Sequence, residues 1–120
     1  MTKKALIQKL YAEDGLRNKD FLNSLIAENF ILKWESSDGF HEMNKQDILD
    51  LADELKINYK FSDVDIFSII EENNIVAVHY LHKVSTLENP NEMIPIAKFM
   101  VFWEFEENKI KKGYQISKLA

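Results

Sequence analysis

The stretch IIEENNIVAVHYLHKV, residues 69–84, holds two apolar runs that are joined by the pair Asn73-Asn74. Asparagine tolerates the positive φ that a tight two-residue turn requires, so this stretch predicts an antiparallel β-hairpin. Apolar residues also alternate along residues 61–71, and two further strands are expected at about residues 93–106 and 109–118, with a turn at Glu107-Asn108. The second half of the chain therefore predicts four antiparallel strands that follow one another in sequence.

The predicted strands differ in how their two faces are populated. In residues 61–71, alternation places Val64, Ile66 and Ile70 on one face and Phe61, Phe67 and Ile69 on the other. In residues 93–106 one face carries Ala97, Phe99, Val101, Trp103 and Phe105, and the other carries Ile94, Ile96, Met100 and Phe102. A strand that is apolar on both faces is expected to be covered on both. The chain has too few helices for that, so the sequence predicts a homodimer that packs through the outer face of the sheet.

The first half of the chain predicts three helices and one strand. Apolar residues recur at helical spacing over residues 3–14, over a shorter segment after Asp20 as N-cap, and after Asn44, which has Asp47 three residues later as in a capping box. Residues 30–35 alternate as a strand and end at the turn 36–39. Helices that precede a run of antiparallel strands must pack against one face of the sheet, so the fold class is α+β, with a single domain over residues 1–120.

Composition excludes several partners and chemistries. The chain has 20 acidic and 15 basic residues, a net charge of -5 and no cysteine. The negative charge disfavours nucleic acid and anionic membrane surfaces as partners. No apolar run is long enough to cross a membrane, and residues 1–14 lack the apolar core of a secretion signal. Without cysteines there is no thiol chemistry and a cytoplasmic location is expected, and without a nucleotide-binding glycine loop no cofactor is predicted.

The order of these elements resembles the nuclear transport factor 2-like superfamily, in particular its SnoaL-like branch. The similar strings are residues 21–34 followed by Asp38-Gly39-Phe40, residues 44–51, residues 72–80 and residues 102–114. This resemblance implies a cystatin-like cone, in which a strongly curved sheet wraps around the N-terminal helix and leaves an apolar pocket. Members of the superfamily include ketosteroid isomerases, polyketide cyclases, dehydratases and protein-binding modules, so the fold does not decide the function.

The resemblance also implies where catalytic acids would stand, and this chain lacks them there. In the isomerases an oxyanion-binding acid would fall at about Val101, a tyrosine near Tyr11 and a base near Glu35, which alternation places on the outer face. SnoaL-like cyclases carry their acid/base aspartate where this chain has Gln115. An amide donates and accepts hydrogen bonds but has no pKa that serves proton transfer. The usual acid positions are thus Val101 and Gln115.

Histidines are the remaining candidates for proton transfer. His79 and His82 are three residues apart on a strand, so their side chains point to opposite faces and cannot share a metal ion. With only His41 besides, no metal site is predicted. His79, His82 and Tyr11 are therefore single candidates for a catalytic role. The structural interpretation, a half-buried histidine on a strand, stays open for both histidines.

The predicted pocket is lined by Trp34, Tyr80, Phe99, Val101 and Trp103, with Gln115 as a polar group. Core packing explains the aromatic residues equally well. Two interpretations follow. In the first, the protein binds a small, mainly apolar molecule in the pocket and, if it is an enzyme, acts as a cofactor-free isomerase, cyclase or lyase. In the second, it is a non-catalytic dimeric binding or scaffold module with a degenerate pocket.

Overall fold

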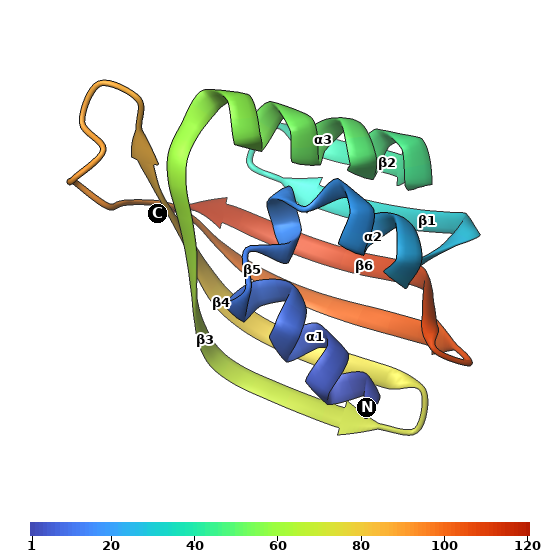
Figure 1. Ribbon diagram of the computed structural model, residues 1–120. Coiled ribbons are helices and arrows are strands. Elements are labelled where there is room, and N and C mark those ends of the chain that lie inside the picture. The colour runs from blue at the N-terminus through green and yellow to red at the C-terminus, as the bar shows by residue number, and fades with distance from the viewer.

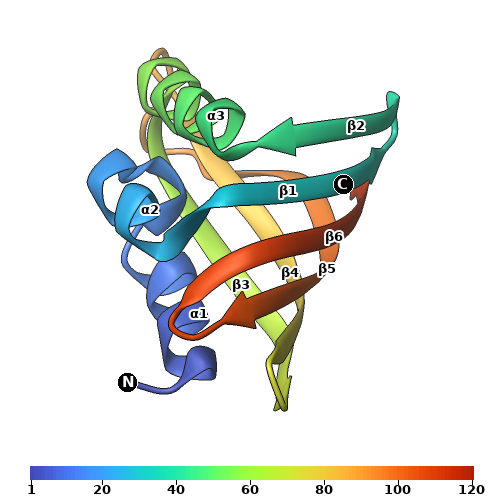
Figure 2. The same cartoon turned by 90° about the vertical axis from the view of Figure 1, so that its right-hand side faces the viewer.

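A six-stranded sheet curves around three helices, all of which lie on its concave face (Figures 1 and 2). The structure, a computed structural model, describes residues 1–120. The strand order is β2-β1-β6-β5-β4-β3, and only β1 and β6 run parallel to each other. The predicted α+β class is therefore confirmed. The strands are β1 (Ile26–Ser36), β2 (Gly39–Asn44), β3 (Tyr59–Glu72), β4 (Ile75–Thr86), β5 (Ile94–Glu106) and β6 (Lys109–Leu119).

The helices are α1 (Lys3–Ala12), α2 (Lys19–Leu25) and α3 (Lys45–Asn58), with a 3₁₀ turn at Gly15–Arg17. The predicted capping box of α3 is present, since Asn44 and Asp47 each bond the other's backbone N–H. The predicted N-cap of α2 is wrong by two residues. Asn18 caps this helix by accepting a hydrogen bond from the Phe21 N–H at 3.0 Å, and Asp20 lies in the first turn. No helix is long and apolar enough to span a bilayer.

One strand was not predicted from the sequence. The sequence predicts a turn and the start of a helix around Gly39–Asn44. In the structure these residues form β2, which pairs with β1 and is an edge of the sheet. All its residues except Met43 are exposed, so no alternation of apolar and polar side chains marks it. The turn before β2 is tight, and Gly39 supplies the positive φ of 117° that it needs.

A β-bulge in β3 overturns part of the predicted face assignment. The pairing of β3 with β4 shifts between Ile66 and Ser68, so the alternation of side chains changes phase there. Ile69 is half-buried on the concave face, whereas Ile70 is exposed beside Phe67 on the convex face. The predicted turns both occur, with a φ of +56° at Asn73, but in the second turn Glu107 and not asparagine has the positive φ.

The core lies between the concave face and the helices. On β5 the buried set is Ala97, Phe99, Val101, Trp103 and Phe105, the face that alternation predicted. The helices contribute Ile7, Leu10 and Tyr11 from α1, Leu22 and Leu25 from α2, and Leu49 and Ala52 from α3. Met100 and Phe102 point away from the helices and are 61% and 59% exposed. The chain itself therefore covers only one face of β5.

Candidate ligand pocket

An apolar cavity of about 180 Å³ lies between the helices and the concave face of the sheet. Of its 18 lining residues 16 are hydrophobic, and the other two are His82 and Gln115. Leucines from all three helices close it on one side, including Leu10, Leu22 and Leu55. No carboxylate lines it, so any charge or hydrogen bond that a ligand meets inside must come from the imidazole, the amide or an aromatic polar tip.

A wide groove of about 1180 Å³ adjoins the cavity at the open end of the cone. Its lining includes the polar residues Ser36, Asp38, His41, Asp47 and Ser117. Trp34, Ile96 and Phe99 line both the groove and the cavity, so these three side chains form the boundary between them. Ile96 reaches the concave side because the pairing of β4 and β5 shifts between His82 and Lys83. A ligand would enter past this boundary.

Aromatic rings form the wall of the cavity on the side of the sheet. Phe99 lies at the centre, with Tyr80 stacked on it at a ring-centroid distance of 4.8 Å and an interplanar angle of 12°, and Trp34 at 6.0 Å. Tyr11 packs behind Tyr80 at 4.4 Å. Such stacked and tilted pairs hold one another in fixed orientations, so this wall has a defined shape.

Trp103 lies deeper in the cone and is anchored by Tyr11. Its indole Nε1–H donates a hydrogen bond of 3.0 Å to the Tyr11 hydroxyl, and both groups are buried. Burial raises the pKa of Tyr11 and of Tyr80, so both phenols stay protonated at physiological pH. The Trp103 ring fits because Gly113 faces it: a Cβ there would come within 2.6 Å of the ring. Tyr11 thus supports Tyr80 and Trp103 from behind and does not itself line the cavity.

Gln115 is buried on β6 and lines the cavity beside this wall. Its amide takes part in no hydrogen bond within the chain, and no fully enclosed side-chain polar atom of the protein lacks a partner. The unbonded amide atoms therefore keep access to open space. A mostly buried amide without a protein partner is costly unless water or a ligand bonds it. Gln115 is the polar group of this cavity that is free to bind a ligand.

His82 is the second polar group of the cavity. It is 4% exposed, and its Nε2 lies 2.7 Å from the Ser62 hydroxyl on β3. Burial is the largest influence on the imidazole and lowers the pKa of His82 from its usual value near 6.5, while Asp14 and Asp63 act in the opposite direction. The ring is therefore neutral at physiological pH and able to accept a proton.

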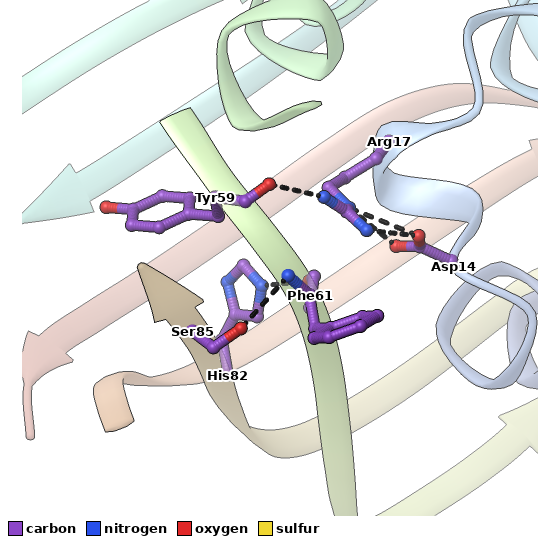
Figure 3. A network of polar contacts seen from close by, with 7 residues as sticks. Asp14, Arg17, Tyr59, Phe61, His82 and Ser85 are labelled. Atoms are coloured by element: carbon purple, nitrogen blue, oxygen red, sulfur yellow. Dashed lines mark hydrogen bonds and ion pairs between the residues drawn. The ribbon is translucent and has the colours of Figure 1, made fainter. Parts of the chain in front are cut away.

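The groups around His82 are themselves held in place. Arg17 forms a bidentate ion pair with Asp14 and donates a hydrogen bond of 3.0 Å to the Tyr59 carbonyl (Figure 3). Ser85 accepts a hydrogen bond from the Phe61 N–H at 3.1 Å. The Arg17–Tyr59 bond fastens the start of β3 to the turn after α1, and the Phe61–Ser85 bond fastens it to β4. Ser62, the partner of the imidazole, follows Phe61 directly on this segment.

His82 and Gln115 do not converge on one point. Across β5, His82 pairs with Ala97 and Gln115 pairs with Val101, four residues further along the strand. That separation is about 13 Å along the strand. Phe99 lies between the two pairing positions. A single functional group of a ligand can therefore contact only one of them.

The structure brings five of the six expected pocket residues to the cavity: Trp34, Tyr80, Phe99, Trp103 and Gln115. Val101 is buried on the same face but is not part of the lining. His79 lies on the convex face, with its ring 5.0 Å from that of Phe67, and Glu35 is exposed. No three histidine, aspartate or glutamate side chains gather as a metal site would require. Sequence analysis missed Ser62, Ile96 and the helix leucines, because their roles depend on strand register and on how the helices dock.

Comparison with known proteins rests on structure alone, since no family model and no curated protein matches the chain. Wild-type IdmH, described as a candidate polyketide cyclase from Streptomyces antibioticus, has a TM-score of 0.74 at 13% identity, over 98% of this chain and 92% of that one. A candidate SnoaL-like polyketide cyclase from Jannaschia sp. CCS1 has a TM-score of 0.70 at 11% identity, over 96% and 85%.

A hypothetical protein of ketosteroid isomerase-like fold from Catenulispora acidiphila, in complex with trimethylamine, has a TM-score of 0.70 at 12% identity, over 92% and 82%. The chain thus has the nuclear transport factor 2-like fold, in the form found in SnoaL-like polyketide cyclases. The expected fold is confirmed.

Proposed function

We propose that the protein binds a small, mainly apolar molecule in the cavity, with one polar group of the ligand bonded to the Gln115 amide. The observation that carries this proposal is the apolar cavity of about 180 Å³ with an unpartnered amide in its wall. A cavity of about 150 Å³ is enough to hold benzene. The ligand class is therefore a ring of six to ten atoms, or a chain of similar volume, that carries a hydroxyl or carbonyl group.

The two tryptophans of the chain, Trp34 and Trp103, both line the cavity, so its occupancy can be followed by intrinsic fluorescence. The probes are cyclohexanol and methylcyclohexane, which have the same number of heavy atoms and differ in one hydroxyl. Both are expected to change the tryptophan emission at saturation. Substitution of Gln115→Met keeps the volume and removes the amide, so it should lower the affinity for cyclohexanol relative to methylcyclohexane by about threefold to tenfold.

The matched control is Gln46→Met, the same chemical change on an exposed side chain of α3 outside the cavity. It should leave the ratio of the two affinities unchanged. An absence of any emission change with either probe would contradict binding in the cavity. An unchanged ratio in Gln115→Met would remove Gln115 from the site.

A second candidate function is cofactor-free catalysis of the isomerase, cyclase or lyase kind, with His82 as the proton carrier. It is favoured by the observation that His82, and not His79, lines the cavity. Burial also lowers the pKa of His82. A neutral imidazole whose Nε2 is hydrogen-bonded to a serine can accept a proton from a carbon next to a carbonyl and return it. Gln115 occupies the place where the cyclases keep their acid and serves only to bind.

Catalysis by His82 is tested with cyclohexanone in D₂O, by following the exchange of the hydrogens next to the carbonyl by NMR. We expect the wild type and His79→Gln to accelerate the exchange and His82→Gln to lose the acceleration. His79→Gln is the matched control, since it changes the same residue type on the opposite face of the same strand. Binding of cyclohexanone without exchange would favour the alternative, a non-catalytic binding or scaffold module.

A further inference from the structure

The groove at the open end of the cone is continuous with the cavity but differs from it in chemistry. It measures about 1180 Å³, against about 180 Å³ for the cavity. Only 9 of its 17 lining residues are hydrophobic, whereas 16 of the 18 around the cavity are. The boundary side chains Trp34, Ile96 and Phe99 carry no charge. One molecule can therefore place an apolar part in the cavity and a polar part in the groove.

The polar side chains of the groove accept hydrogen bonds and carry negative charge. They are serines, His41 and the carboxylates of Asp38, Glu42 and Asp47, and no lysine, arginine, asparagine or glutamine is among them. An ionised carboxylate only accepts hydrogen bonds. The Trp34 Nε1–H is already bonded to the Ser117 hydroxyl at 2.8 Å. The groove therefore suits a ligand group that donates hydrogen bonds.

Two of the carboxylates have no cation of the protein beside them. Asp38 lies in the turn before β2 and Asp47 in the first turn of α3, so they border the groove beyond the two ends of β2 (Figures 1 and 2). Neither forms an ion pair within the chain. Glu42 is opposite Lys33 in the pairing of β1 with β2, so its charge is offset. Asp38 and Asp47 thus supply the free negative charge of the groove.

Strand β6 gives the distance between the cavity and the groove. Gln115 lines the cavity and Ser117 lines the groove. The two residues lie on the same face of the strand, about 7 Å apart along it. Gln115 is 5% exposed and its amide has no partner in the chain, which independently favours a ligand in this continuous space. A six-membered ring with a side chain of about three carbons spans the distance.

We propose that the groove binds a primary amine at the end of a ligand whose apolar ring lies in the cavity. This inference rests on the proposed function, since the cavity must hold the ring. An alkylamine is protonated at physiological pH, as a lysine side chain is, and its three N–H groups meet acceptors that carry negative charge. It can also contact the face of Trp34. A carboxylate in the same place would meet like charges and no cation. The ligand class is therefore an apolar ring that carries an aminoalkyl chain.

The test compares three probes that share one ring and one chain length: cyclohexylpropylamine, cyclohexylpropanol and cyclohexylpropanoate. Their affinities are measured by tryptophan emission in about 150 mM salt, which largely screens charges farther away than about 8 Å. The wild type should bind the amine at least about tenfold more tightly than the carboxylate, with the alcohol between them. Cyclohexanol, which fits inside the cavity, is measured alongside and reports on the proposed function alone.

The decisive variant is Asp38→Ser/Asp47→Asn, which removes the two free charges and keeps an acceptor for the Asn44 N–H. It should lower the ratio of amine to carboxylate affinity at least about threefold, since exposed ion pairs each contribute modestly. The control Asp20→Ser/Glu54→Gln removes the same net charge at exposed positions of α2 and α3 outside the groove and the cavity. It should leave the ratio within about twofold of the wild type. The affinity for cyclohexanol should be the same in all three proteins.

Three results would overturn the inference. The first is a wild type that binds the carboxylate as tightly as the amine, and the second is an unchanged ratio in Asp38→Ser/Asp47→Asn. The third is an equal fall of the ratio in the control, because the net charge of -5 and not the groove would then attract the amine. If cyclohexanol still binds in these cases, the proposed function stands without an amine site. If none of the four probes changes the emission, both proposals are wrong.

Discussion

The two faces of the sheet are built from the same strands but lie in different environments. On β5, Phe105 on the concave face is 1% exposed, while Phe102 on the convex face is 59% exposed. The concave face is covered by helices and shapes a cavity, and the convex face presents a row of apolar side chains to solvent. Alternation in sequence thus says which residues share a face. What covers that face is decided by the rest of the chain, or by a partner.

The largest expected difference between the faces is in stability. Phe105→Ala removes a ring from the closed core and should lower the free energy of unfolding by about 3–5 kcal/mol. Phe102→Ala makes the same change on the same strand, three residues away, and should lower it by less than about 1 kcal/mol in the monomer. Urea unfolding followed by fluorescence at submicromolar protein concentration measures both. Equal losses would show that the convex face is as closely packed as the core.

A smaller difference is expected for a matched pair of tyrosines. Tyr11→Phe removes the acceptor of the Trp103 Nε1–H and leaves that donor buried without a partner, so it should lower the free energy of unfolding by about 1–3 kcal/mol. Tyr114→Phe removes a hydroxyl from the convex face, where Tyr114 is 46% exposed, and should change it by less than about 0.5 kcal/mol.

Near-ultraviolet circular dichroism should also report a changed Trp103 environment in Tyr11→Phe only. If Tyr11→Phe were neutral, the Tyr11–Trp103 hydrogen bond would not be what anchors the inner wall of the cavity.

Much of the fold could be predicted because local chemistry determines it. Asn44 and Asp47 cap α3 through their own side chains, and Asn73 takes the positive φ of its turn. β2 could not be predicted, since an edge strand with nearly all side chains exposed carries no hydrophobic period. The bulge in β3 could not be predicted from the sequence either. An extra residue between Ile66 and Ser68 changes which face the following side chains occupy, without changing the composition of the strand.

The candidate site was predictable to the extent that strand parity determines it. Parity places His79 and His82 on opposite faces, and the family resemblance placed Gln115 in the pocket; the structure has all three residues there. Parity does not give the depth of a residue within the cone. Val101, which was expected to line the pocket, is buried on the same face but is not part of the lining. The contact between Ser62 and His82 depends on the pairing of two strands, and a residue 20 positions away gives no local signal of it.

The smallest expected effect is on how the stability of the protein depends on pH, and it distinguishes the two histidines of β4. Burial holds the pKa of His82 below its usual value in the folded state, so as the pH falls the unfolded chain takes up this proton first. The stability that neutral His82 contributes is fully present above about pH 6.5 and is lost as the pH falls from there through the lower pKa of the folded state. Urea midpoints measured from pH 7.5 to pH 5 should therefore decline in the wild type. His82→Gln should lose that component of the decline, and His79→Gln should keep it. If His82→Gln declined as steeply as the wild type, other groups would produce the decline, and folding would not lower the pKa of His82.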